Sequence, residues 1–150
     1  MLIRPVQPQD FAAWKPLWDG YNAFYERAGP TALPDPITQA TWQRFFDAYE
    51  PVHCLVAEGE GGQLLGLVHY LYHRTTIGIG PNCYLQDLFT AEAARGKGVG
   101  RALIEGVYER AQADGCGRVY WHTRDGNATA RRLYDQMAEG GGVVVYRKIF

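Results

Sequence analysis

A glycine-rich loop at residues 95–101 constrains the fold of this chain more than any other segment. Apolar residues at 83–90 indicate a strand before it, and residues 98–114 carry apolar side chains at the spacing of a helix after it. Glycines let the backbone approach a ligand closely, and a helix start offers unpaired N–H groups at the positive end of the helix dipole. A strand, a glycine loop and a helix in this order predict a phosphate-binding site.

The spacing of the glycines excludes two widespread classes of phosphate loop. A Walker loop requires Gly-Lys-Ser/Thr, whereas Lys97 is followed by Gly98. A dinucleotide-binding loop requires Gly or Ala five residues after its first glycine, and Leu103 stands at that distance from Gly98. Counting from Gly96 gives Arg101, which fails in the same way. A simple glycine turn before a helix stays open as the alternative without a ligand.

The remaining pattern predicts one α/β domain over residues 1–150, a length typical of a single domain. The residues 28–37, rich in Pro and Gly, are expected to form a loop, and Pro16 is expected to kink or divide the first helix. A second short helix is expected around Trp42. We expect strands at residues 2–6, 52–57, 64–72, 83–90, 118–123 and 143–149, and longer helices at residues 10–25, 98–114 and 127–139. This order predicts a mixed sheet with helices on its faces.

Composition limits the classes of partner. Fifteen Lys and Arg against sixteen Asp and Glu give a net charge of −1, which argues against nucleic acid and against anionic membranes. No apolar run approaches the roughly 20 residues of a membrane-spanning helix, and the N-terminus lacks the pattern of a signal peptide. Cys54, Cys83 and Cys116 have no metal-binding spacing and indicate reduced thiols. We therefore expect a cytoplasmic protein without a metal, a nucleic-acid partner or a membrane.

Two motifs together resemble the GNAT superfamily of N-acetyltransferases. Arg95-x-x-Gly98-x-Gly100 is similar to the loop with which that family binds the pyrophosphate of acetyl-CoA, and residues 127–134 are similar to its next helix. The order of elements also fits over nearly the whole chain, most closely to the yeast-type histone/polyamine and diamine acetyltransferases. The resemblance implies a mixed, mostly antiparallel sheet of six to seven strands, splayed in the middle and flanked by about four helices.

In this family acetyl-CoA lies in the gap where two central strands splay apart. The resemblance implies that the strand before the loop binds the pantetheine arm and the thioester oxygen through backbone groups, while the loop amides bind pyrophosphate. The residues so implied are Leu88, Phe89, Thr90, Arg95, Gly96, Lys97, Gly98, Val99, Gly100, Arg101, Asn127 and Ala130. Asn127 could equally cap its helix, and the basic side chains could be solvated surface charges.

The resemblance implies direct attack of a primary amine on acetyl-CoA in a ternary complex. Tyr134 is expected to protonate the departing thiolate as general acid, the alternative being a core tyrosine. Polyamine-type relatives carry a glutamate where Gln86 stands, and Gln86 cannot accept the proton of an alkylammonium. Asp87 is therefore the candidate base, provided that a bulge turns it from the opposite face of an ideal strand. His69 and His73 are candidate proton relays.

The sequence leaves the acceptor open among small amines, polyamines, amino acids, aminoglycosides and a protein or peptide lysine. A non-catalytic acyl-CoA sensor or scaffold is the alternative function, because Gln86 replaces the glutamate. Only one strand-like segment, residues 143–149, follows the last helix. We therefore expect a homodimer in which this segment pairs at or across the interface, the alternative being a monomer with a shorter sheet.

Overall fold

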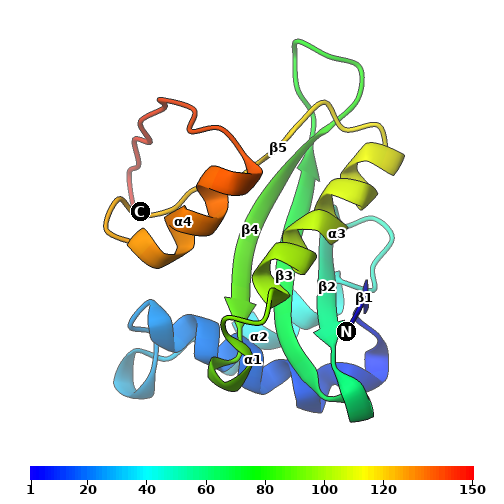
Figure 1. Ribbon diagram of the computed structural model, residues 1–150, viewed down its shortest axis with the longest axis vertical. Coiled ribbons are helices and arrows are strands. Elements are labelled where there is room, and N and C mark those ends of the chain that lie inside the picture. The colour runs from blue at the N-terminus through cyan, green and yellow to red at the C-terminus, as the bar shows by residue number, and fades with distance from the viewer.

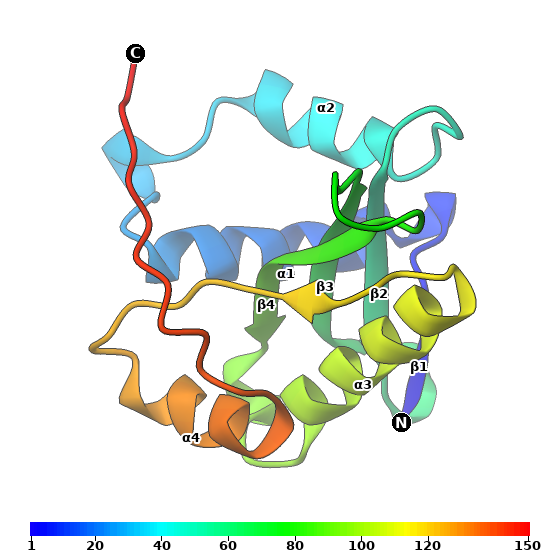
Figure 2. The same ribbon diagram turned by 90° about the horizontal axis from the view of Figure 1, so that it is seen from above.

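The computed structural model describes residues 1–150 as a five-stranded sheet covered by helices on both faces (Figure 1). The strands are β1 (Leu2–Pro5), β2 (Val52–Glu58), β3 (Leu64–His73), β4 (Asn82–Thr90) and β5 (Val119–Tyr120). The helices are α1 (Phe11–Phe24), α2 (Asp35–Arg44), α3 (Val99–Ala113) and α4 (Ala128–Met137). Helices α1 and α2 lie on one face of the sheet, and α3 and α4 lie on the other (Figure 2).

The sheet opens between its last two strands. Its order is β1-β2-β3-β4-β5, antiparallel except for the parallel pair β4–β5. That pair holds only two residue pairs, Cys83 with Val119 and Tyr84 with Tyr120. From Leu85 to the end of β4, the edge that faces β5 therefore has no strand partner. The predicted mixed α/β fold is confirmed, and its splay lies between the last two strands rather than in the middle of the sheet.

Alternating side chains of the central strands divide the core into two layers. Leu67 points toward the α1 face, where Trp14, Leu17 and Trp18 are buried. Val68, the next residue, points toward the α3 face and its own apolar cluster. Because both faces of β2 and β3 are covered, these strands lack the polar face of a half-exposed sheet. The packing of both layers fixes the position of β4 on both sides.

The expected last strand at residues 143–149 is absent, and the expected count of six to seven strands is therefore wrong. These residues have no regular secondary structure and run outside the sheet beyond α4 (Figure 1). A strand needs a neighbouring edge to pair its backbone groups, and this segment meets none within the chain. The strand expected at residues 118–123 is likewise reduced to Val119–Tyr120, because β5 leaves β4 after two residue pairs.

Proline positions account for two further differences. Helix α2 begins at Asp35, inside the segment expected to be a loop, and Pro36 occupies its first turn. The missing N–H of proline costs nothing there, because first-turn N–H groups have no helical acceptor. Pro16 lies within α1, yet α1 is one helix from Phe11 to Phe24 rather than two pieces.

Candidate functional site

The open edge of β4 forms one wall of a gap to which both faces of the sheet contribute. Tyr134 comes from α4 on one face, and Asp87 comes from β4 on the face covered by α1. Tyr25, just after α1, lies close enough to contribute to the raised pKa of the Tyr134 phenol. The two layers of the fold thus contribute one candidate group each, a phenol from α4 and a carboxylate from β4.

The glycine loop leads from the end of β4 into the start of α3. Gly96 and Gly98 have φ angles of 73° and 78°, in the left-handed region that favours glycine. Gly98 occupies the N-cap position of α3, and no side chain caps the helix. The N–H groups of the first turn therefore have no partner within the helix. A Cβ placed on either glycine would meet no atom within 4 Å, so the loop is not packed against the rest of the protein at these two positions.

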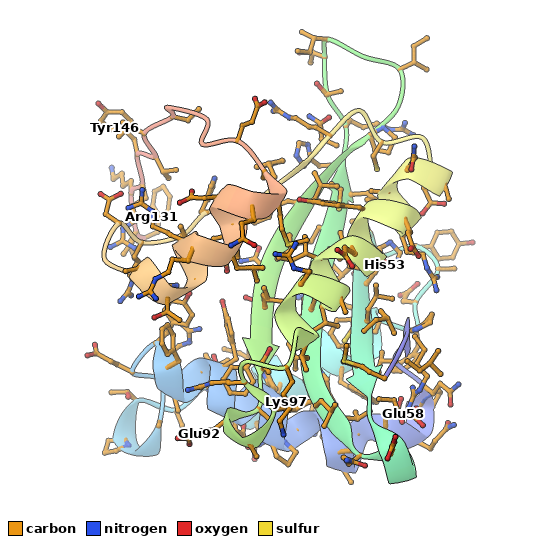
Figure 3. The ribbon with its side chains drawn as sticks, in the orientation of Figure 1. His53, Glu58, Glu92, Lys97, Arg131 and Tyr146 are labelled. Carbon is orange, nitrogen blue, oxygen red and sulfur yellow. The ribbon has the colours of Figure 1, made fainter.

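The basic side chains of the loop are free of carboxylate partners. Lys97 Nζ donates to the carbonyl of Ala93 at 2.9 Å, and Arg101 donates to Gln136 on α4. No salt bridge involves Arg95, Lys97 or Arg101. Figure 3 places Lys97 beside the start of α3 and Arg131 on α4. These positive charges and the amides of the first helical turn can bind an anionic group, and the loop directly follows the unpaired edge of β4.

Helix α4 packs against the first turn of α3 and closes the other side of the loop. A Cβ on Gly100 would lie 3.4 Å from Leu133, so the two helices approach closely at this glycine. Asn127 precedes α4, but its side chain contacts Thr123 Oγ1 at 3.3 Å and makes no capping bond. Asn127 stands at the N-cap position, but the alternative role, capping of the helix by its side chain, is not seen. Asn127 and Ala130 both lie at the start of α4, after the loop that leaves β5.

Tyr134 is half-buried and keeps a free hydroxyl. Its ring packs edge-on against Trp121, with the ring centroids 5.3 Å apart. Burial raises the pKa of the phenol above its usual value, and the nearby Tyr25 phenol adds to this. The side chain therefore packs against the core, as the alternative role required, and still keeps the free hydroxyl that the expected acid role needs. It holds a proton at neutral pH and has no protein acceptor for it.

Asp87 is brought to the α1 face by a bulge in β4. His69 of β3 pairs with Asp87, whereas the next residue, Tyr70, pairs with Leu85, so Gln86 is the extra residue. Gln86 is exposed, and Asp87 is buried. Asp87 Oδ2 lies 2.9 Å from Nδ1 of His69. The conditional expectation for Asp87, that a bulge is present, is met in the structure.

Trp14 fixes the protonation pattern of His69. Its indole Nε1 lies 3.2 Å from His69 Nε2, and an indole nitrogen can only donate. His69 Nε2 is therefore an acceptor, so the proton lies on Nδ1 and points at Asp87. The sequence predicted for Trp14 only that it lies within the helix expected at residues 10–25. No local pattern could have found this role, since it depends on a contact over 55 positions.

The other candidate relay, His73, lies apart from this group. Its ring nitrogens contact the carbonyl of Arg74 at 2.8 Å and the hydroxyl of Tyr120 at 2.7 Å. The structure therefore brings His69, but not His73, together with Asp87. No group of three or more His, Cys, Asp or Glu side chains could hold a metal ion. No helix has the length and apolar character needed to cross a membrane.

Comparison with known proteins agrees with this geometry. Residues 14–138 match the acetyltransferase (GNAT) family. The chain is 36% identical over 149 residues to a D-amino-acid N-acetyltransferase of Saccharomyces cerevisiae, covering 99% of this chain and 90% of the relative. It is 37% identical over 91 residues to a thialysine N-epsilon-acetyltransferase of Mus musculus, covering 55% of this chain and 52% of the relative.

A solved structure extends the likeness to the whole fold. The aminoglycoside N-acetyltransferase AAC(6')-Iy in complex with CoA superposes with a TM-score of 0.80 at 19% identity. The match covers 98% of this chain and 93% of that one. The family match and the long alignment with the yeast relative confirm the resemblance found in the sequence. The chain belongs to the GNAT family of acetyltransferases.

Proposed function

We propose that this acetyltransferase moves the acetyl group of acetyl-CoA to the primary amine of a small molecule in a ternary complex. The observation that carries the proposal is the unpaired edge of β4, which leads to an uncapped helix start and lies between the layers that contribute Tyr134 and Asp87. Relatives named for D-amino acids and thialysine support a small-molecule acceptor. A non-catalytic acyl-CoA sensor would have no need of a buried carboxylate and a free phenol on opposite sides of the gap.

In this proposal the chain binds acetyl-CoA mainly through its backbone. Amides of residues 96–101 would hold the pyrophosphate, with Arg95, Lys97 and Arg101 adding positive charge. The open edge of residues 88–90 would pair with the pantetheine arm, and Asn127 with Ala130 would border it from α4. When bound, acetyl-CoA supplies an acetyl group activated as a thioester.

The two acid–base residues would act on opposite sides of the reacting carbonyl. Asp87 accepts a proton from the ammonium of the acceptor, which frees the nitrogen lone pair for attack. The new C–N bond forms as the C–S bond breaks, and the acylated nitrogen loses its second proton to solvent to give the neutral amide. Tyr134 gives its phenolic proton to the leaving sulfur, and its raised pKa keeps that proton available at neutral pH.

Ligand-induced stabilisation tests the cofactor assignment. Acetyl-CoA at about 100 times its dissociation constant should add about 2.7 kcal/mol to the free energy of unfolding, whereas NAD and ATP should add little. Gly98→Ala should abolish this gain, because a side chain strains the loop backbone at that positive φ. Gly115→Ala is the matched control, with a φ of 75° and equally open surroundings at the far end of α3. Equal stabilisation of both variants would contradict the assignment.

We further propose that two copies of the chain associate through residues 143–150. The apolar side chains Val143, Val144, Val145, Tyr146, Ile149 and Phe150 are all exposed. A surface hollow of about 350 Å³ lies beside β5, lined by Val119, Tyr108 and Met137 among others. An apolar tail of one copy could fill this hollow in the other and extend the sheet from β5.

Light scattering on a size-exclusion column tests this association. The full chain should run as a dimer, and a variant lacking residues 143–150 should run as a monomer. A single 16.8 kDa species of the full chain at high concentration would overturn the proposal.

A further inference from the structure

Two arginines lie over the same tyrosine, Tyr25, which follows α1 and lies near Tyr134. The guanidinium carbon of Arg27 is 5.4 Å from the centroid of the Tyr25 ring, and that of Arg124 is 5.1 Å from it. Arg27 follows α1, whereas Arg124 belongs to the loop between β5 and α4. Both views of the fold place these two segments on the same side of the molecule (Figures 1 and 2). Tyr25 thus joins two cations that are 97 positions apart in the sequence, since 124 − 27 = 97.

Neither guanidinium has an anionic partner in the protein. Arg27 Nε donates to the amide oxygen of Asn22 at 2.7 Å, and no salt bridge involves Arg27 or Arg124. Arg4 shows the contrast, since it is paired with both Asp10 and Glu58. A guanidinium carries five N–H donors in a planar fork that matches a carboxylate. Most of the N–H donors of Arg27 and Arg124 are therefore free to bind a ligand.

The negative charge of Asp87 lies beside the neighbouring Tyr21 side chain. Tyr21 is buried: burial and then the carboxylate of Asp87 raise the pKa of its phenol. The Arg27 guanidinium lies 5.8 Å from the centroid of the same ring. Tyr21 therefore lies close to both the Asp87 carboxylate, which His69 contacts as well, and the Arg27 guanidinium. A ligand that carries an ammonium and a carboxylate a few bonds apart has the matching arrangement of charge.

We propose that Arg27 and Arg124 form the carboxylate subsite for an amino-acid acceptor whose amine lies against Asp87. This inference rests on the proposed acetyl transfer and narrows its acceptor. A diamine or an aminoglycoside would place a second cation beside two guanidinium groups, which repels it. An amino acid places its carboxylate there and forms charge-assisted hydrogen bonds. The arginines thus select for a zwitterion and against polycations of similar length.

Matched acceptors that differ only in the carboxylate test the subsite. Alanine and phenylalanine, each as both enantiomers, are compared with ethylamine and 2-phenylethylamine, and putrescine represents the diamines. The wild type should have a kcat/KM for the better enantiomer about 10- to 100-fold above that for the matching amine. Arg27→Gln and Arg124→Gln should each lower this ratio about tenfold, through KM for the amino acid. Arg124→Lys should fall in between, because it keeps the charge and loses the fork.

Arg110→Gln, an exposed change on α3, is the control and should leave the ratio unchanged. Equal kcat/KM for alanine and ethylamine, or a higher value for putrescine, would overturn the subsite while leaving acetyl transfer intact. A change confined to KM for acetyl-CoA would also overturn it, because the arginines would then serve the cofactor. Failure of the wild type to acetylate any of these amines would instead count against the proposed function.

A binding measurement tests the subsite without turnover. With CoA present, calorimetry compares N-acetylalanine, the expected product, with N-ethylacetamide, which lacks only the carboxylate. The wild type should bind N-acetylalanine at least about tenfold more tightly, and Arg27→Gln should remove that difference. Equal affinity of the wild type for both compounds would overturn the carboxylate subsite even in an inactive protein.

Discussion

Asp87 on β4 and His69 on β3 are joined by a 2.9 Å hydrogen bond at the residue where the register of the two strands slips. Gln86 is the extra residue of the bulge that turns Asp87 toward the α1 face. The indole N–H of Trp14 donates to Nε2 of His69, the ring nitrogen that does not contact Asp87. The imidazole of His69 is thereby contacted at both ring nitrogens. It orients the carboxylate of Asp87, the group that we propose as the base.

Removal of this carboxylate should slow the reaction without weakening cofactor binding. Asp87→Asn keeps the size of the side chain but cannot accept the proton of the acceptor, so kcat/KM for the amine should fall about 10²- to 10⁴-fold. Steady-state kinetics and the acetyl-CoA-induced thermal shift measure the two effects. Asp19→Asn, an exposed change on α1, should leave both unchanged. Near-wild-type turnover of Asp87→Asn would exclude Asp87 as the base.

Two tryptophans of α1 offer a matched test of the His69 tautomer. Trp14→Phe removes the donor to His69 Nε2, whereas Trp18→Phe removes an indole N–H that is buried without a partner. The first variant should lose about 1–2 kcal/mol more stability, because it leaves a buried acceptor unpaired. Nitrogen NMR should detect the other tautomer of His69 in Trp14→Phe only. An unchanged His69 spectrum in both variants would contradict the positioning role of Trp14.

Tyr134→Phe should lower kcat by at least about 100-fold and leave the affinity for acetyl-CoA within about twofold, because only the proton donor is lost. Burial raises the pKa of this phenol above its usual value of 10.0, so the acid form persists as the pH rises. The wild-type rate should therefore show no loss due to Tyr134 below about pH 10. Tyr49→Phe, a change at a fully exposed phenol, is the control. Unchanged turnover of Tyr134→Phe would reject it as the acid.

Local patterns predicted the strand, glycine loop and helix from β4 to α3, because their signals lie within neighbouring residues. The contact between Trp14 and His69 could not be predicted, since it needs the packing of α1 on the sheet. The sequence could not decide whether β4 has a bulge at Gln86, because the register of a strand depends on its partner strand. For residues 143–149 the local pattern predicted a strand that the structure does not contain. Their β-branched sequence favours a strand, but a strand forms only where an unpaired edge meets it.

Gly20 of α1 should be essential, because it leaves room for the side chain of Phe89 near the end of β4. A Cβ on Gly20 would lie 2.6 Å from Cζ of Phe89, so Gly20→Ala must displace the ring just before the cofactor loop. We expect a loss of about 1–3 kcal/mol in stability and weaker binding of acetyl-CoA. Chemical denaturation and ligand titration measure both. Gly140→Ala, where a Cβ meets nothing within 4 Å, should change neither. A fully stable Gly20→Ala variant would show that Phe89 moves freely.

The ion pair of Arg4 and Asp10 should make part of the stability depend on pH. Arg4 donates two hydrogen bonds to Asp10, at 2.6 Å and 3.1 Å, and these hold the pKa of the carboxyl below its usual 3.8. A folded-state pKa below the unfolded value adds stability above the unfolded pKa, and this gain is lost as the pH falls through the folded pKa. Asp10→Asn should therefore cost about 2 kcal/mol at pH 7 and close to nothing below the folded pKa.

Denaturant unfolding at pH 7 and in strong acid measures this difference for the wild type and the variant. Asp19→Asn, which breaks an exposed pair with Lys15, should cost no more than about 0.5 kcal/mol at either pH. Asp10 is more buried than Asp19 and accepts hydrogen bonds from more donor groups, so the pH dependence of stability should change for Asp10→Asn only. An equal loss of stability for Asp10→Asn at both pH values would contradict this prediction. It would mean that packing, rather than the charge of Asp10, holds the turn at residues 8–10 against β1.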